Sequence, residues 1–208
     1  MNKQVEWWSN EGGFFGEKYM EGDDSLEGFL PNKKESLSER TKREVDGVIK
    51  LTGVKKGDKI LDMPCGYGRH SIDLAKKSFS VVGIDINEEE LMKAKENSKR
   101  QKIVFLKRDM REIGKENYDK FDAVINMFYS FGFFEKESDN YKTMKEYYNA
   151  LKKGGKLLLH TDVSPEMFEG GEYRFEEERT LKNGKKLIIK EHYNNKTKRI
   201  EGSWTIVF

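Results

Sequence analysis

The chain has very little cysteine, little proline and no long apolar run. Of its 208 residues, one is a cysteine, Cys65, and three are prolines. A single thiol excludes an internal disulfide framework and is typical of a reducing compartment. No run of about 18 apolar residues occurs, and the first residues lack an apolar segment of signal-peptide length. We therefore expect a cytoplasmic protein that has no membrane partner.

The chain also lacks a surplus of charge of one sign. Its 39 basic and 37 acidic residues give a net charge of +2 and are interspersed along the sequence. Binding to a nucleic-acid backbone depends on clustered lysine and arginine, so this distribution argues against a nucleic-acid partner. The three histidines, His70, His160 and His192, lack the spacing of metal ligands, so no metal is expected.

Helix-like and strand-like segments alternate over most of the chain. Apolar residues at helical spacing over 37–52 are followed by the apolar runs KILDM, SVVGID, IVFLKRD, FDAVINMF and KLLLHT, with helical patterns between them. Strands that are apolar on both faces are typical of a parallel sheet covered by helices on both sides. The pattern predicts an α/β fold with a Rossmann-like, doubly wound, mostly parallel sheet and right-handed crossovers.

The pattern changes towards the C-terminus. Three strand-like runs, EYRFEEERTL, KKLIIKEHY and KRIEGSWTIVF, are joined by Asn183-Gly184 and by NNKT, which are turn signals. We interpret residues 166–208 as an antiparallel β meander. Residues 37–165 are then the ligand-binding domain, and residues 1–36, with several aromatic residues and glycines, form an N-terminal helical cover.

The segment DMPCGYG lies where the first predicted strand turns into a helix. In an open parallel sheet, ligands bind beyond the carboxyl ends of the strands, near the switch point. Gly66 and Gly68 carry no Cβ, so a ligand can approach the backbone there. A dinucleotide is disfavoured because Ser71 stands at the third glycine of G-x-G-x-x-G, and no G-x-x-x-x-G-K-[ST] motif indicates a nucleoside triphosphate.

Three acidic residues narrow the choice of ligand. Asp85 ends the second predicted strand, where a carboxylate can accept hydrogen bonds from both hydroxyls of a ribose. Asp109 ends the third strand, where a carboxylate can accept a hydrogen bond from the adenine amine, beside Met110. Asp62, in the loop, suits an ammonium group. Nicotinamide enzymes also require an acid like Asp85 but have less need of Asp109, so the set describes S-adenosylmethionine.

Five segments carry a family resemblance. ILDMPCGYGRHSIDLA, VVGIDIN, FLKRDMREI, FDAVINMFYSFGFF and LKKGGKLLLHT resemble the successive motifs of class I S-adenosylmethionine-dependent methyltransferases. The pair RDMREI and NMFYSFGFF is most similar to small-molecule N-methyltransferases, such as the N,N-dimethyltransferases of antibiotic amino-sugar biosynthesis. The resemblance covers residues 37–208. It implies that Gly66, Asp85, Asp109 and Met110 hold the cofactor, and it adds Tyr19 and Arg40 as further candidates. The full set of predicted cofactor-binding residues also includes Asp62, Cys65, Gly68, Ile86 and Met127.

The sequence departs from that family at its end. Members continue past the meander with a helix and two more strands, which gives a seven-stranded sheet, whereas this sequence stops at Phe208. We therefore expect the last two strands to be missing, in a truncated chain, a split gene product or a shortened variant. The fifth strand then has an unpaired edge, which predicts that a second copy covers this edge or the meander to form a homodimer.

Each candidate residue also has a plain structural interpretation. Asp62 can cap its loop, and Asp85 can be a solvated acid at a strand end. Asp109 can form a surface ion pair with Arg111, which follows two residues later. Cys65 is more readily a packed residue than a nucleophile, because the sequence pairs it with no clear acid or base.

The segment NMFY, residues 126–129, follows the fourth predicted strand. It shares the spacing of Asn and Tyr with the Asn-Pro-Pro-Tyr motif of nucleobase amino-methyltransferases but lacks both prolines. We interpret it as an ordinary loop that places Tyr129 and Ser130 near the substrate. Tyr129 and His160, at the end of the fifth strand, are the candidate catalytic residues because either could accept a proton from an amine.

We predict a methyltransferase that transfers a methyl group from S-adenosylmethionine to a small-molecule acceptor by in-line displacement. Alignment of the reactants is the main demand on such a protein, and it can contribute roughly 7–11 kcal/mol. The resemblance favours an amine acceptor over a hydroxyl. The alternatives are a methyltransferase that acts on RNA or protein, and a non-catalytic cofactor-binding or assembly module.

Overall fold

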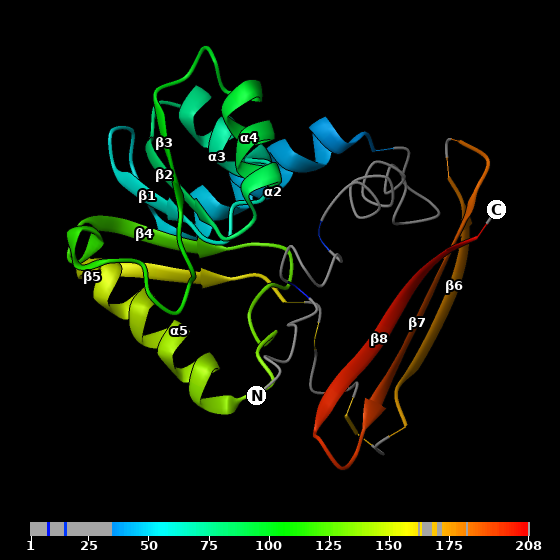
Figure 1. Cartoon of the computed structure of the whole chain (residues 1–208). Coiled ribbons are helices and arrows are strands. Elements are labelled where there is room, and N and C mark those ends of the chain that lie inside the picture. The colour runs from blue at the N-terminus through cyan, green and yellow to red at the C-terminus, as the bar shows by residue number, and fades with distance from the viewer. Residues whose placement is uncertain are drawn as a thin grey trace. The chain divides into compact units, whose positions relative to one another are not determined.

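The computed structural model describes Trp8, Phe15 and residues 35–161, 163, 168–169, 172–181 and 183–207. These residues fall into two compact units (Figure 1). The first contains Trp8, Phe15 and residues 35–161, and the second contains the described residues from Val163 onward. Most of the predicted N-terminal cover, including Tyr19, lies outside the described residues.

The first unit is built on a five-stranded parallel sheet with the strand order β3-β2-β1-β4-β5. Its strands are β1 (Lys59–Asp62), β2 (Ser80–Asp85), β3 (Ile103–Lys107), β4 (Phe121–Asn126) and β5 (Leu151–Leu159). The order reverses between β1 and β4, so the switch point lies beyond the carboxyl ends of these two strands. The predicted Rossmann-like sheet is confirmed.

Among the described residues, three helices and one short 3-10 turn connect these strands, and a further helix, α2, precedes β1. They are α2 (Leu37–Thr52), α3 (Arg69–Lys76), α4 (Glu88–Asn97), α5 (Glu137–Ala150) and η1 (Lys115–Asn117). At the start of α2, Ser36 and Glu39 form a capping box, in which each side chain accepts a hydrogen bond from the other residue's amide. The N-cap of α4 is Asn87, whose side chain accepts hydrogen bonds from the amides of the first turn.

Each face of the sheet carries its own apolar core. On one face, α2 and α3 pack against the sheet, and Val45 lies with Ile60. On the other face, α5 contributes Tyr147, which lies with Leu61. Because successive residues of a strand point to opposite faces, Ile60 and Leu61 belong to different cores. This burial on both faces is the reason for the continuous apolar runs in the sequence, and Figure 1 shows helices on both sides.

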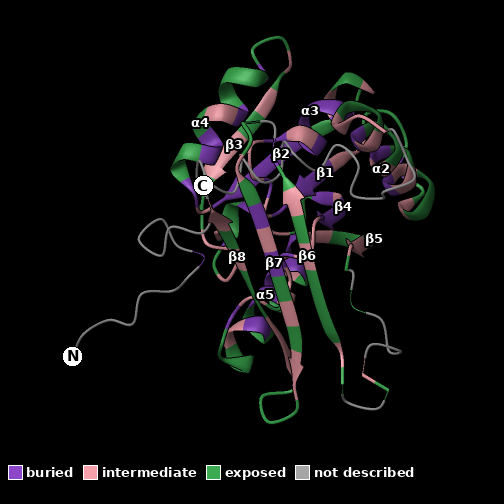
Figure 2. Cartoon of the chain, turned by 90° about the vertical axis from the view of Figure 1, so that its right-hand side faces the viewer, coloured by how far each residue is buried: buried purple, intermediate pink, exposed green. Residues whose placement is uncertain are grey.

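The second unit is a three-stranded antiparallel sheet, as predicted for the meander. It consists of β6 (Arg174–Thr180), β7 (Lys186–Asn194) and β8 (Arg199–Val207) in the order β6-β7-β8. Buried, intermediate and exposed residues follow one another along β7 (Figure 2). The inward residues form a small core of Leu181, Leu187 and Ile189 with Trp204 and Ile206.

β5 forms one edge of the parallel sheet. Within the described ranges, no sixth or seventh strand is added beside it. All nine of its residues keep some exposure, whereas the last four residues of β4 are buried. In the same part of the chain, no helix combines the length and the apolar character needed to cross a membrane.

Candidate functional site

The loop between β1 and α3 contains two glycines in the left-handed conformation. Gly66 has a φ of +52° and Gly68 has a φ of +79°. Residues other than glycine rarely adopt such values. A Cβ on Gly68 would lie 3.0 Å from Ala94 Cβ and 3.1 Å from Phe105 Cζ, so this glycine is needed for packing. A Cβ on Gly66 would meet only Glu90 Oε2, at 3.7 Å. Gly66 is therefore the glycine that leaves room beside the backbone.

Cys65 is a packed residue of this loop. Its amide donates a hydrogen bond to the Ile84 carbonyl at 2.9 Å, which ties the loop to β2. A Cβ on Gly83 would lie 2.9 Å from Cys65 Sγ, so the thiol packs directly against the β2 backbone. Burial raises the pKa of the Cys65 thiol well above its usual range. A thiol held neutral in this way is a poor nucleophile, which favours the packing interpretation.

Asp62 is fully buried at the carboxyl end of β1. The Ser71 hydroxyl donates to Asp62 Oδ2 at 2.6 Å, and Oδ1 is buried without a hydrogen-bond partner. Burial raises the pKa of Asp62 to about 7, against hydrogen bonding by Ser71 and the positive charge of Arg69. A buried acceptor that has no hydrogen bond costs free energy. A hydrogen-bond donor on a ligand would therefore stabilise Oδ1.

Asp85 lies at the carboxyl end of the neighbouring strand β2 and is also buried. Oδ2 accepts a hydrogen bond from the Gly66 amide at 2.8 Å, and Oδ1 accepts one from the Asn87 amide at 2.9 Å. Burial raises the pKa of Asp85, while these backbone hydrogen bonds oppose the rise. Each carboxylate oxygen keeps a further acceptor site, so Asp85 is oriented to receive two more donors. Ile86 follows it directly.

Asp109 follows β3 and forms the ion pair that was one of its two interpretations. The Arg111 side chain contacts both oxygens, with Nη2 2.6 Å from Oδ2 and Nε 3.0 Å from each oxygen. The Arg111 amide also donates to Oδ1, at 2.8 Å. Met110, between them, contributes to the core, and its Sδ lies 3.9 Å from the Tyr147 hydroxyl.

The loop after β4 contains two consecutive aromatic residues in the left-handed region. Phe128 has a φ of 65° and Tyr129 a φ of 63°, which is uncommon for residues other than glycine and indicates local strain. The Tyr129 amide donates to the His160 carbonyl at 3.1 Å, and their rings lie 4.8 Å apart. The two candidate catalytic residues are therefore neighbours. Met127, before them, is buried in the core, and Ser130, after them, is also buried.

Asn126, the last residue of β4, is a buried polar group that the sequence prediction did not include. Its amide nitrogen donates to the Met63 carbonyl at 3.1 Å and to the Tyr147 hydroxyl at 2.6 Å. Its side-chain oxygen is buried and has no hydrogen-bond partner. The NMFY segment drew attention to this position, but only the structure reveals the unsatisfied acceptor.

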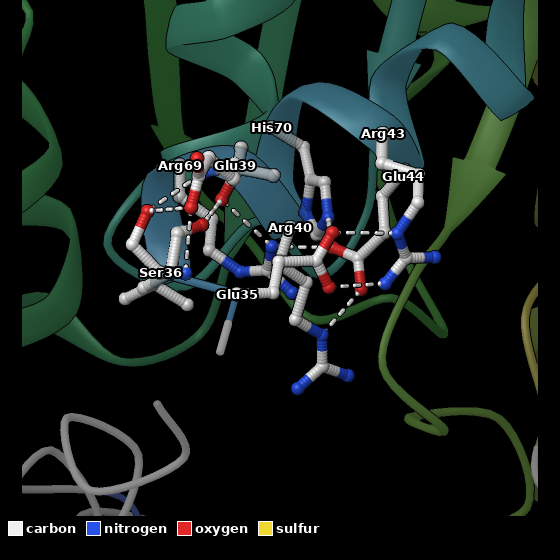
Figure 3. Close-up of polar contacts among 10 residues, drawn as sticks. Glu35, Ser36, Glu39, Arg40, Arg43, Glu44, Arg69 and His70 are labelled. Atoms are coloured by element: carbon white, nitrogen blue, oxygen red, sulfur yellow. Dashed lines mark hydrogen bonds and ion pairs between the residues drawn. The ribbon is translucent and has the colours of Figure 1, made fainter. Parts of the chain in front are cut away.

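A cluster of charged side chains joins α2 to the first residues of α3 (Figure 3). Glu44 accepts hydrogen bonds from Arg40 Nε at 2.9 Å, from Arg69 Nη1 and from His70 Nε2 at 2.9 Å. Burial and the neighbouring Arg69 lower the pKa of His70 to about 4. Burial alone would raise the pKa of Glu44, but the His70 hydrogen bond and the Arg69 charge hold it well below its usual range.

The guanidinium groups of Arg40 and Arg69 also contact the loop after β4. Arg40 Cζ and Arg69 Cζ each lie 4.7 Å from the centre of the Phe128 ring. Such cation–π contacts hold a positive charge against an aromatic face. The predicted residue Arg40 is thus brought to the β4 loop. Arg69 and Phe128 were not predicted, because their contact depends on segments 59 positions apart in the sequence.

The structure brings most of the predicted residues to the carboxyl edge of the sheet. Asp62 and Asp85 end neighbouring strands, and Gly66 is hydrogen-bonded to Asp85. Tyr129 and His160 pack together at the ends of β4 and β5. This arrangement presents buried acceptors to a ligand that carries several hydrogen-bond donors.

Comparison with known proteins identifies the family. The sequence model of a family described as a methyltransferase domain matches residues 54–201, which is well over half of the chain. The chain therefore belongs to this methyltransferase domain family.

Individual proteins agree with this assignment. YqeM of Bacillus subtilis (strain 168), itself only provisionally named a methyltransferase, is 42% identical over 108 residues, which cover 51% of this chain and 43% of that protein. A glycine/sarcosine N-methyltransferase of Aphanothece halophytica is 32% identical over 138 residues, which cover 64% of this chain and 52% of the relative. The chain thus spans about half the length of these curated relatives.

A solved structure shows the same fold. The crystal structure of an S-adenosylmethionine-dependent methyltransferase from Clostridium acetobutylicum (ATCC 824) superposes with a TM-score of 0.59 at 14% identity. The match covers 91% of this chain and 80% of the other chain. At this level of identity, the likeness concerns the fold alone.

Proposed function

We propose that the protein is an S-adenosylmethionine-dependent methyltransferase that methylates a small-molecule amine. The observation that carries this proposal is the pair of buried acids at neighbouring strand ends. Asp62 keeps one oxygen without a hydrogen-bond partner, and Asp85 is held by the Gly66 and Asn87 amides. Membership of the methyltransferase domain family supports the same conclusion.

The residues at this edge fit the cofactor. S-adenosylmethionine carries an ammonium group, a ribose diol and an adenine amine, all of which are hydrogen-bond donors. The unsatisfied side-chain oxygens of Asp62 and Asn126 are acceptors suited to the ammonium group. The two oriented oxygens of Asp85 suit the diol. Asp109 is the acceptor proposed for the adenine amine.

Further residues complete the proposed cofactor site. Arg40 supplies a positive charge for the cofactor's carboxylate, and Gly66 leaves room for its chain. Contacts to the apolar parts are assigned to Ile86, Met110 and Met127, and Cys65 and Gly68 shape the loop. Tyr19, which lies outside the described residues, remains a predicted contact.

The protein's main contribution to the reaction is alignment. S-adenosylmethionine supplies, when bound, a methyl group that its sulfonium charge already activates. The amine must be neutral to attack, so its proton has to be accepted by a nearby base or by water. Tyr129 and His160 are the candidates, because either side chain could accept a proton and the two rings lie 4.8 Å apart beside the β4 loop. Holding the amine in line with the reacting bond is worth roughly 7–11 kcal/mol.

The acceptor is proposed to be a small metabolite. The relative from Aphanothece halophytica is named for glycine and sarcosine, which are small amines. The balanced and dispersed charge of the chain offers no platform for a phosphate backbone. We therefore propose that the protein does not bind nucleic acid.

Two further proposals concern the oligomeric state and the cellular location of the protein. The exposed edge of β5, or the meander, is proposed to pair with a second copy to form a homodimer. The single buried thiol of Cys65 supports a cytoplasmic location.

The test combines binding with turnover. Isothermal titration calorimetry should detect S-adenosylmethionine binding, and label from the methyl group should move into glycine, sarcosine or an amine of a metabolite extract. Binding without transfer to any acceptor would favour a non-catalytic module. Label recovered in bulk tRNA, with salt-dependent binding, would instead identify an RNA methyltransferase.

A further inference from the structure

Arg111 lies at the centre of contacts that join three separate parts of the first unit. Its side chain contacts both oxygens of Asp109 after β3, and Nη1 lies 3.1 Å from Asp139 Oδ2 in the first turn of α5. Its guanidinium carbon lies 4.4 Å from the centre of the Phe134 ring and 5.3 Å from that of Trp8.

These contacts fix the direction of the Asp109 carboxylate. Three N–H groups reach it through four hydrogen bonds: the Arg111 amide and Nε contact Oδ1, and Nε and Nη2 contact Oδ2. The single Nε hydrogen is shared between the two oxygens, so three hydrogens serve about four acceptor sites and one further donor can be accepted. Asp85, by contrast, accepts one backbone hydrogen bond on each oxygen, from the Gly66 and Asn87 amides. Asp109 is therefore prepared for a single donor and Asp85 for a pair.

We propose that Arg111 is a positioning residue for the adenine end of the cofactor. It holds Asp109 so that the one remaining acceptor site meets the exocyclic amine, and so selects an amine over a carbonyl at that position. The inference rests on the proposed function, because it assumes that the adenine ring lies beside Asp109.

The aromatic contacts explain why an arginine is needed here. Trp8 and Phe134 pack edge to face, with their ring centres 5.4 Å apart, and Arg111 lies over both rings. A planar guanidinium can make a two-point contact with a carboxylate and still lie against aromatic faces, which a lysine ammonium cannot do. Trp8 is buried, so the rings hold the guanidinium in place.

The experiment compares two ligands that differ at the exocyclic group of the base and at the neighbouring ring nitrogen, which carries a hydrogen only in the inosine compound. S-adenosylhomocysteine has the exocyclic amine, and S-inosylhomocysteine has a carbonyl oxygen in its place. Calorimetry on the unmodified protein should show at least tenfold tighter binding of the adenosine compound, since the carbonyl would face the Asp109 carboxylate.

Arg111→Gln should weaken S-adenosylhomocysteine at least tenfold and leave S-inosylhomocysteine nearly unchanged, so that the preference for the amine disappears. Asp139→Asn, which removes one anchor of Arg111 without touching Asp109, should reduce the preference by a smaller factor. The matched control is Arg108→Gln, because the exposed Arg108 side chain pairs with the exposed Glu116 at 3.4 Å and donates to the Lys107 carbonyl at 3.3 Å, away from Asp109. This control should bind both ligands as the unmodified protein does.

Several results would overturn the inference. An equal loss of affinity for both ligands in Arg111→Gln would mean a general structural role, and an unchanged preference would mean that Arg111 does not direct Asp109. If Arg111→Gln does not fold, Asp139→Asn decides between the same outcomes. Failure of the unmodified protein to bind either ligand would refute the proposed function itself, which separates the two failures.

Discussion

The Gly66 amide donates a hydrogen bond of 2.8 Å to Asp85 Oδ2, and this contact joins the loop after β1 to the end of β2. The Asn87 amide holds the other oxygen at 2.9 Å. Both donors belong to the backbone, so these two contacts orient the carboxylate without a side-chain donor. The proposed ribose contact uses the acceptor sites that these two amides leave open.

Asp85→Ala should therefore weaken cofactor binding at least tenfold. The substitution removes two hydrogen bonds to a charged acceptor, each worth about 1.5–3 kcal/mol. Calorimetry with S-adenosylmethionine measures the loss, and circular dichroism checks that the fold is intact. Asp46→Ala is the control, because Asp46 is an exposed acid paired with Lys77 on the surface. An unchanged dissociation constant in Asp85→Ala would refute the ribose assignment.

The two glycines of the loop should respond differently to alanine. Gly68→Ala combines a left-handed conformation with contacts of 3.0–3.1 Å to Ala94 and Phe105, so it should lower the free energy of unfolding by roughly 2–4 kcal/mol. Gly66→Ala carries only the conformational cost, about 1–2 kcal/mol, but should weaken cofactor binding. Urea unfolding and calorimetry measure the two effects. Equal destabilisation without a binding defect at Gly66 would contradict this division.

Asp62 should make stability depend on pH in an unusual direction. Its pKa is about 7 in the folded state against an ordinary 3.8, so between these values the folded protein keeps a proton that the unfolded chain releases. The contribution of Asp62 to stability is present below about pH 4 and is lost as the pH rises to 7.

Asp62→Asn isolates this contribution. The free energy of unfolding of the variant, relative to the unmodified protein, should rise with pH by about 1.4 kcal/mol for each unit between pH 4 and 7. His70, whose pKa is lowered to about 4, acts in the opposite direction in both proteins and cancels in the comparison. Denaturant unfolding at several pH values provides the test. A difference that does not vary with pH would mean that Asp62 titrates normally.

The variant with glycine at position 129 should be more stable than the variant with alanine there. The φ of 63° is strained for any residue with a Cβ, so Tyr129→Gly should exceed Tyr129→Ala in the free energy of unfolding by about 1 kcal/mol. Thermal or urea unfolding of the two variants gives the comparison. The opposite order, which is usual in helices and strands, would show that the loop relaxes from this conformation.

The edge of β5 leads to a prediction about assembly. Static light scattering at micromolar concentration should give about twice the 24.4 kDa mass of one chain. A mass that stays at one chain over this range would count against the homodimer.

The central strands β1, β2 and β4 could be predicted because they are buried on both faces. Ile60 and Leu61 serve different cores, which makes the apolar run continuous and easy to detect. The position of Asp85 at the end of β2 could be predicted from the apolar run before it, whereas its role in ribose binding stays a prediction. For Asp109 the sequence left two interpretations open, since a ligand contact and an ion pair with Arg111 require the same residues.

Other parts of the site could not be predicted from the sequence. An aromatic side chain gives no signal for a left-handed backbone, so the conformation of Phe128 was not anticipated. The contacts of Glu44 with Arg69 and His70 join residues that are 25 and 26 positions apart, and no local pattern specifies them. Unsatisfied acceptors such as the Asn126 oxygen depend on which neighbouring atoms are missing, which only the packed structure shows.

The cluster around Glu44 limits how segments of this protein can be exchanged with those of its relatives. A chimera that imports the segment from β1 to β2 brings Arg69 and His70 with it, but their shared carboxylate comes from α2. In a host without an acid at that position, the largely buried guanidinium of Arg69 would lose its counter-charge. The unit of exchange is therefore the helix together with the loop, and residues 44, 69 and 70 should vary as a set.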